Sequence, residues 1–199
     1  RRLAIIGLSP AGAQPMADAE GGLRLVFNGE IYNYRALRAE LEGLGATFRT
    51  YTDTEVIIEG WRRWGRGVLS RLRGMFALAL WDERAKGMLL ARDPYGIKPL
   101  YLADDGATLR AASQVKALLA GGALDTAPDP AGHAGFFLWG HVPEPHTLYR
   151  AIRPLPAGSW LWLEEGGRRE EGRFFDLRAE LAAGREGRFE PDALRAAQD

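Results

Sequence analysis

An Asn-Gly pair between a β-type run and a helix-type run most constrains what this chain can fold into. The apolar run Leu25–Phe27 leads into Asn28-Gly29, and Tyr34–Leu41 then places leucines at helical spacing. Asn-Gly between apolar runs is the strongest short hairpin signal. At the exposed end of a strand, the same pair can instead aim an amide side chain and a glycine N–H at one point, as an oxyanion requires. Taken alone, the pair favours the turn.

Charge and residue counts exclude several classes of protein. The chain has 26 Lys and Arg against 26 Asp and Glu, so no net field attracts nucleic acid or acidic membranes. Its 199 residues include no cysteine, and therefore no disulfide, thiolate nucleophile or cysteine-ligated metal. The three histidines, His133, His141 and His146, lack metal-ligand spacing, so we expect loop or packing roles for them and no metal site. No apolar run approaches the ~20 residues of a membrane span, and we expect a cytoplasmic protein.

Both ends of the sequence suggest a piece of a longer protein. Arg1-Arg2 leads directly into a strand-like run, and the helix start at Pro191-Asp192 stops within two turns. Residues 184–190 combine two glycines with charges and are the candidate linker. We therefore expect one domain over residues 1–185, and a linker with the start of a second domain over residues 186–199.

The predicted elements are short and mostly strands. Strands are expected at Leu3–Leu8, Leu23–Phe27, Gly74–Trp81, Met88–Arg92, Leu100–Ala103, Thr108–Ala112 and Ser159–Glu164, with Arg173–Phe175 pairing with the last. Helices are expected over Tyr34–Leu44 and, with Thr52 or Asp53 as its N-cap, over a second segment that runs through Trp64. Because the helices come as a pair and do not alternate with strands, the order favours an α+β fold with antiparallel sheets over a doubly wound sheet.

Three charged residues stand beside these elements. Arg2 precedes an apolar run, Glu30 follows Asn28-Gly29, and Asp53 opens a helix. Each has a structural reading, as a surface charge, a turn residue and an N-cap. Together they would also suit a free α-amino acid, with Arg2 on its carboxylate and Glu30 and Asp53 on its ammonium group. The spacing alone does not show that they converge.

The segment Arg92–Tyr101 is a second unusual constellation. Asp93-Pro94 and Gly96 force a sharp reversal, with an arginine before it and Lys98-Pro99 after it. None of these residues is an obvious nucleophile. We interpret the segment as a braced structural corner.

Five motifs occur in a fixed order along the chain. They are Leu25–Asn33, Thr52–Glu55, Arg73–Ala77, Arg92–Tyr101 and Ser113–Leu118. Their order and spacing resemble the glutaminase domain of asparagine synthetase-like class II glutamine amidotransferases, from Arg1 to about Leu177. The resemblance implies an N-terminal-nucleophile hydrolase fold, an αββα sandwich of two antiparallel sheets, with its N-terminal part missing from this sequence.

The resemblance also implies a reaction. In that family an N-terminal cysteine attacks the carboxamide carbon of glutamine, with its own α-amine as the base. A thioester forms, ammonia leaves, and water releases glutamate. The ammonia then reaches an ATP-dependent synthetase domain, which amidates an acceptor carboxylate such as that of aspartate. ATP and Mg²⁺ are thus expected in that second domain, and no cofactor is expected in this one.

Carried over by motif, the catalytic residues are Asn28 and Gly29, whose side-chain amide and backbone N–H would form the oxyanion hole. The rest of the glutamine would be bound by Arg2, Ile5, Ile6, Glu30 and Asp53. Arg2 would hold the carboxylate, the two isoleucines would line the pocket through their backbone, and the acidic pair would hold the ammonium group. Glutamine and the synthetase domain are therefore the expected partners, with a homodimer as a further candidate.

Two departures from the family limit these expectations. The nucleophilic cysteine and the Ser-Gly-Gly-x-Asp-Ser loop that binds ATP are absent from these residues. We therefore expect this stretch alone to be inactive, and to fold marginally or with a partner. One alternative is a catalytically inactive, ligand-binding relative of the β-lactam synthetase type. The other is a structural or interaction domain with a turn at Asn28-Gly29.

Overall fold

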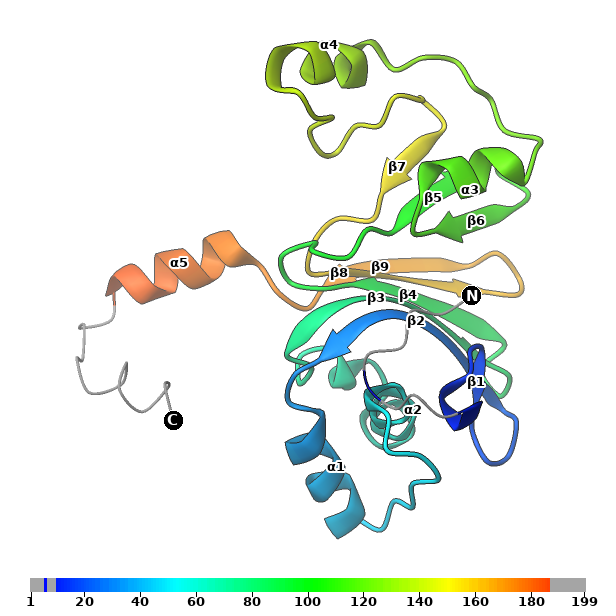
Figure 1. Cartoon of the computed structure of the whole chain (residues 1–199), viewed down its shortest axis with the longest axis vertical. Coiled ribbons are helices and arrows are strands. Elements are labelled where there is room, and N and C mark those ends of the chain that lie inside the picture. Colours follow the sequence, from blue (N-terminus) through cyan, green and yellow to red (C-terminus); the bar gives the residue numbers. More distant parts are fainter. Residues whose placement is uncertain (1–5, 7–9, 187–199) are drawn as a thin grey trace.

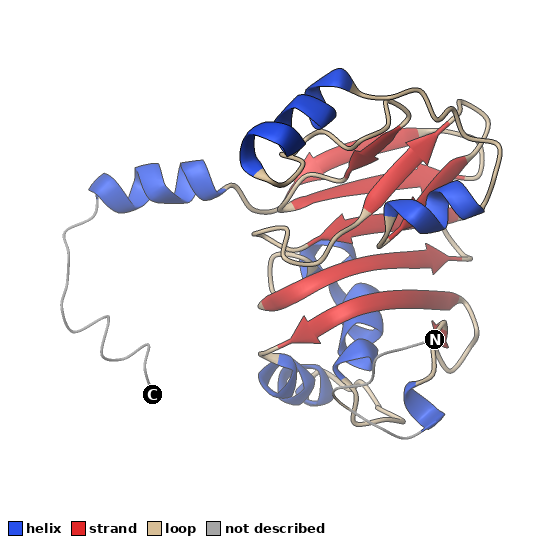
Figure 2. Cartoon of the chain, turned by 45° about the horizontal axis from the view of Figure 1, so that its top comes forward, coloured by secondary structure: helices blue, strands red, loops and turns tan. Residues whose placement is uncertain are grey.

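Two antiparallel sheets lie between helical layers in the computed structural model, which describes residue 6 and residues 10–186 (Figures 1 and 2). The larger sheet has the strand order β1-β2-β3-β4-β8-β9, and the smaller has the order β6-β5-β7. Every recorded strand pair is antiparallel. The predicted αββα sandwich is confirmed. The strand expected at Leu3–Leu8 falls outside the described residues except for Ile6.

The described elements follow in chain order. The strands are β1 (Met16–Ala17), β2 (Leu23–Ile31), β3 (Gly74–Asp82), β4 (Gly87–Arg92), β5 (Tyr101–Asp104), β6 (Leu109–Ala112), β7 (Ile152–Pro154), β8 (Ser159–Glu164) and β9 (Arg169–Arg173). The helices are α1 (Tyr34–Gly43), α2 (Asp53–Trp64), α3 (Val115–Ala120), α4 (Pro130–Trp139) and α5 (Leu177–Glu186), with the short 3₁₀ turns η1 (Pro10–Gly12) and η2 (Gly65–Val68). Both predicted helices are confirmed. The sequence analysis did not predict β1, β7, α3, α4 or α5.

Alternating side chains decide which face of the large sheet meets which layer. In β2, Leu25, Phe27 and Ile31 are buried against α1 and α2, whereas Val26 and Asn28 on the other face are exposed. In β8, Trp162 stacks on Trp61 of α2 at 5.7 Å between ring centroids. The apolar core between the two sheets consists of Ala77, Leu90, Leu100, Leu155 and Leu161. On the outer side of the small sheet, α3 packs through Leu118.

The strand β2 does not end at Asn28-Gly29, so the hairpin reading of this pair is wrong. It continues to Ile31, and Gly29 lies opposite Phe76 in the register with β3. Here glycine permits a close approach of two strands. A β-carbon on Gly29 would lie 2.1 Å from the carbonyl oxygen of Met75, and one on Gly74 would lie 2.1 Å from that of Glu30.

Two predictions near the C-terminal end also need correction. The segment that pairs with β8 is Arg169–Arg173, and Phe174 and Phe175 instead donate their N–H groups to the carbonyl of Gly158. Helix α5 runs to Glu186, so the predicted linker over 184–190 begins inside a helix. The strong helix formers before Gly184 outweigh the cost of one glycine, about 1 kcal/mol. Figure 1 shows α5 projecting away from the sandwich. The domain boundary after residue 185 stays a prediction.

Candidate functional site

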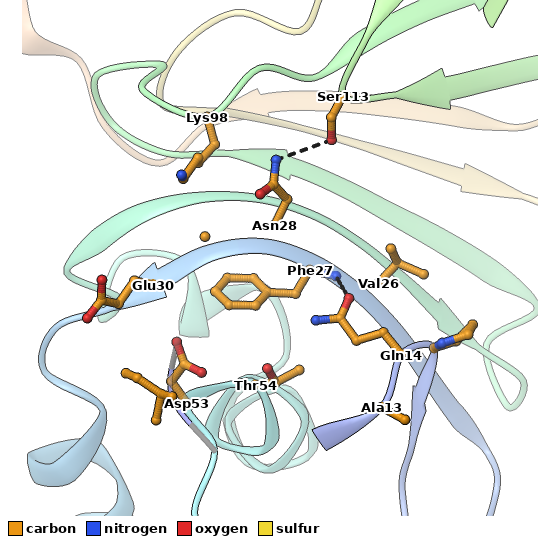
Figure 3. Close-up of a pocket in the computed structure, with 13 residues that line it drawn as sticks. Ala13, Gln14, Val26, Phe27, Asn28, Glu30, Asp53, Thr54, Lys98 and Ser113 are labelled. Atoms are coloured by element: carbon orange, nitrogen blue, oxygen red, sulfur yellow. Dashed lines mark hydrogen bonds between the residues drawn. The ribbon is translucent and has the colours of Figure 1, made fainter. Parts of the chain in front are cut away.

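A cavity of about 630 Å³ lies along the edge of β2 (Figure 3). Five of the residues predicted from the sequence line this cavity: Ile6, Asn28, Gly29, Glu30 and Asp53. Arg2 and Ile5 lie outside the described residues. The cavity is completed by Ala13, Gln14, Pro15, Val26, Phe27, Thr54, Lys98 and Ser113.

Hydrogen-bond alternation along β2 decides which backbone groups face this cavity. Tyr32 just after the strand donates its N–H to the carbonyl of Arg73 at 2.8 Å, so even-numbered residues of β2 bond toward β3. Odd-numbered residues therefore direct their N–H groups to the opposite edge. On that edge the two-residue strand β1 pairs only with Arg24 and Leu25. Beyond Leu25, the edge faces the cavity.

The backbone N–H groups of Phe27 and Ile31, two residues before and after Gly29, are both bound by side chains. Phe27 donates its N–H to Oε1 of Gln14 at 2.8 Å, and Ile31 donates its N–H to Oδ2 of Asp53 at 3.1 Å. The N–H of Gly29 lies between these two on the same edge, and it has no recorded acceptor among the described residues. Gly29 thus offers a backbone donor to a ligand in the cavity.

The side chains of Asn28 and Glu30 extend from the opposite face of β2 to the buried residues. Nδ2 of Asn28 lies 3.4 Å from Oγ of Ser113, a long and weak hydrogen bond that leaves the amide able to serve a ligand. Glu30 is half-buried and follows Gly29 directly. One amide, one backbone N–H and one carboxylate therefore adjoin in three consecutive residues.

Asp53 reaches the cavity from the N-terminus of α2, and it is 3% exposed. The sequence left the N-cap of α2 to either Thr52 or Asp53, and the structure assigns it to Thr52, whose side chain accepts from the N–H of Glu55. Asp53 is the first helical residue, where a carboxylate is favoured by the helix dipole. Glu55 turns away from the cavity and accepts the N–H groups of Arg49 and Thr50 at 2.8 and 2.7 Å.

Several cavity residues were missed as site residues from the sequence. Lys98 and Ser113 lie in two of the five motifs that carry the family resemblance, but neither was predicted to be a site residue. Thr54 lies in the motif Thr52–Glu55 but was not proposed as a site residue, and Gln14 lies in none of the five motifs. Among the described residues, Oγ1 of Thr54 is the one buried side-chain polar atom without a hydrogen-bond partner. Such an atom is costly unless something binds it.

The braced corner predicted at Arg92–Tyr101 is confirmed. Asp93 is fully buried and accepts the backbone N–H groups of Phe76, Tyr95, Ile97 and Lys98. The guanidinium of Arg92 donates to the carbonyls of Gly96, Lys98 and Leu155 and pairs with Glu144 at 2.7 Å. The corner presents Lys98 to the cavity.

His133 and His146 are half-buried packing residues, and His141 is an exposed loop residue. His133 and His146 both contact Asp129, and His141 contacts the carbonyl of Trp139. Within residue 6 and residues 10–186, no group of three His, Asp or Glu side chains is placed to hold a metal ion. In the same residues, no helix is long and apolar enough to cross a membrane.

Comparison of the sequence with known protein families identifies the family to which this chain belongs. Residues 1–175 match the glutamine amidotransferase domain family. The chain is a member of that family. The glutamine amidotransferase domain accounts for nearly the whole sequence, as the order of the five motifs had indicated.

Similar proteins carry this domain as part of a longer chain. The putative glutamine-hydrolyzing asparagine synthetase of Mycobacterium tuberculosis (strain H37Rv) is 44% identical over 165 residues, which are 79% of this chain and 25% of that protein. Asparagine synthetase 1 of Bacillus subtilis, also named as glutamine-hydrolyzing, is 38% identical over 167 residues, covering 84% and 26%. The chain thus spans about a quarter of the length of these relatives.

Solved structures agree with the fold. The glutamine phosphoribosylpyrophosphate amidotransferase of B. subtilis matches with a TM-score of 0.58 and 25% identity over 83% of this chain and 32% of that one. A glutamine aminotransferase class-II domain protein from Silicibacter pomeroyi matches with a TM-score of 0.52 over 84% and 73%. At 16% identity, this second likeness concerns the fold alone.

Proposed function

We propose that this domain binds glutamine at the β2 edge and, within a longer cytoplasmic protein, supplies ammonia to an ATP-dependent synthetase domain. The acceptor we infer is a carboxylate such as that of aspartate. The names of the relatives support this assignment, since both name a glutamine-hydrolyzing asparagine synthetase. The binding-only alternative is not favoured, because those names describe hydrolysis.

One observation carries the assignment of the site. The open N–H of Gly29 lies beside the amide of Asn28, with carboxylates from Glu30 and Asp53 on the same cavity. In our proposal the two donors hold the carboxamide oxygen and stabilise the negative charge that develops on it. The two carboxylates hold the α-ammonium group through charge-assisted hydrogen bonds. Arg2 would hold the α-carboxylate, with Ile5 and Ile6 lining the pocket.

Hydrolysis needs a nucleophile that these residues do not provide. The 199 residues contain no cysteine, so we propose that this stretch alone binds glutamine without turning it over. In the longer protein, a cysteine sulfur would bond to the carboxamide carbon and expel ammonia, and water would then cleave the thioester to glutamate. ATP and Mg²⁺ belong to the synthetase domain in this proposal. A homodimer is proposed only as a candidate assembly.

Isothermal titration of the domain with L-glutamine tests the proposal. We expect saturable binding of L-glutamine, with D-glutamine as the matched control that binds at least about tenfold more weakly. Glu30→Gln preserves the size of the side chain and removes its charge, so it should weaken binding while the melting temperature stays unchanged. Equal affinity for both enantiomers, or binding that is indifferent to Glu30→Gln, would overturn the assignment.

A further inference from the structure

Lys98 brings a positive charge to a cavity whose other charged side chains are acidic. Among the described residues that line it, Lys98 is the one cation, and Glu30 and Asp53 are the acidic residues. No ion pair is recorded between Lys98 and any other described residue. Figure 3 shows its side chain reaching from the corner toward the face of β2 that carries Asn28. The charge therefore lies on the Asn28 side of the cavity.

The backbone of Lys98 is held on both sides by buried charged residues. Its N–H donates to Oδ2 of Asp93 at 2.9 Å, and its carbonyl accepts from Nε of Arg92 at 2.9 Å. Asp93 is fully buried and Arg92 is 4% exposed, so the side chains that make these two hydrogen bonds are shielded from water. Hydrogen bonds to buried charged groups are stronger than those between neutral groups. The corner thus fixes where the lysine side chain begins.

The same carboxylate also holds the strand behind Gly29. Oδ2 of Asp93 accepts the N–H of Phe76 at 3.2 Å, and the N–H of Asp93 donates to the carbonyl of Phe76 at 2.8 Å. Phe76 lies opposite Gly29 in the pairing of β2 with β3. One buried carboxylate therefore positions Lys98 and Gly29 relative to each other.

We propose that Lys98 stabilises negative charge at the end of the cavity where Asn28 and Gly29 hold the ligand's side-chain oxygen. This inference rests on the proposed function and adds a charged residue to its oxyanion site. A neutral carboxamide becomes anionic as a nucleophile adds to it, so a fixed ammonium group favours the charged form more than the ground state. A fixed cation at this end should also favour a γ-carboxylate over a γ-carboxamide. Lys98 should therefore increase the affinity of the domain for L-glutamate more than its affinity for L-glutamine.

Titration of three proteins with both amino acids tests this inference without any nucleophile. We expect Lys98→Met to weaken L-glutamate binding by about tenfold and L-glutamine binding by less than about threefold. Lys98→Arg keeps the charge and should retain most of the glutamate affinity. Thermal melting of each variant shows whether the corner is intact. In the wild type, raising sodium chloride from ~0.05 to ~0.5 M should weaken glutamate binding more than glutamine binding.

The outcomes separate this inference from the proposed function. Equal weakening of both ligands would mean that Lys98 binds the α-carboxylate that they share, and this would overturn the inference while leaving glutamine binding in place. An unchanged glutamate affinity in Lys98→Met, or salt effects equal for the two ligands, would overturn it as well. A wild-type domain that binds neither amino acid would reject both proposals together.

Discussion

Asp53 accepts the N–H of Ile31 at 3.1 Å, so the carboxylate proposed for ligand binding also joins the start of α2 to the edge of β2. Asp53→Asn keeps an oxygen that can accept from Ile31 but removes the negative charge. We expect it to weaken glutamine binding by about 10- to 100-fold, the loss of one charge-assisted hydrogen bond. Asp53→Ala removes both roles and should also destabilise the fold by about 1–3 kcal/mol. Calorimetric titration and urea unfolding measure the two effects; equal stability losses in both variants would contradict the division of roles.

Gly29 should not tolerate a side chain, because a β-carbon there meets the carbonyl oxygen of Met75. We expect Gly29→Ala to destabilise the domain by about 3 kcal/mol, since rigid strand backbone must move to make room. Gly43→Ala is the matched control. It lies in α1 with no atom within 4 Å of an added β-carbon, and it should be neutral or stabilising by up to about 1 kcal/mol. Urea unfolding measures both. Similar effects at the two positions would argue against the close strand contact.

Because the hydroxyl of Thr54 has no hydrogen-bond partner among the residues that the structure describes, we expect Thr54→Val to be stabilising. Replacing it with a methyl group removes a buried donor without a partner, which should raise stability by about 1 kcal/mol and the melting temperature by roughly 2–4 °C. Thr147→Val is the control, because the hydroxyl of Thr147 donates to the carbonyl of Ile152 at 2.9 Å. Loss of this hydrogen bond should lower the melting temperature. A fall in the melting temperature of Thr54→Val would show that this hydroxyl has a partner.

Helix α4 has glycines on its inner face and aromatic residues outside. A β-carbon on Gly132 would lie 1.9 Å from the carbonyl oxygen of Thr147, whereas Phe137 is 83% exposed. We expect Gly132→Ala to destabilise the domain by about 1–3 kcal/mol and Phe137→Ala to change it by less than about 0.5 kcal/mol. Denaturant unfolding compares them. A large loss from Phe137→Ala would mean that this ring is buried in solution.

Acid should remove the contribution of Asp129 to stability. The side chain of His146, 3.1 Å away, lowers the pKa of the Asp129 carboxyl below its ordinary value, and the N–H of Ala131 also bonds to the carboxylate. Because the folded-state pKa is depressed, the stabilisation is complete above the unfolded pKa of about 3.9 and is lost as pH falls through the folded value. The difference in melting temperature between wild type and Asp129→Asn should therefore shrink from pH 5 to pH 2. A constant difference would contradict this linkage.

Local patterns in the sequence were sufficient to predict the family of this protein, the two helices that cover the large sheet and most of its strands. The apolar alternation of β2, the cap at Thr52 and the reversal at Asp93-Pro94 depend on residues next to one another, and all three appear in the structure. The order of the motifs was sufficient to indicate a glutamine amidotransferase domain. Residues 184–190 show the limit of composition, because glycines suggested a linker where the helix formers before them extend α5.

Tertiary structure alone decided what the Asn28-Gly29 pair does. The pair stays extended because β3, distant in sequence, supplies both the partner strand and the matching Gly74. The Gly29 N–H faces the cavity because neighbouring donors are bound by Gln14 and Asp53, which come from other parts of the chain. Local propensity cannot specify such partners, since a hydrogen bond or close contact between distant residues exists only once the chain has folded. The sequence alone therefore supplied the donors, and the fold determined that one backbone N–H faces the cavity.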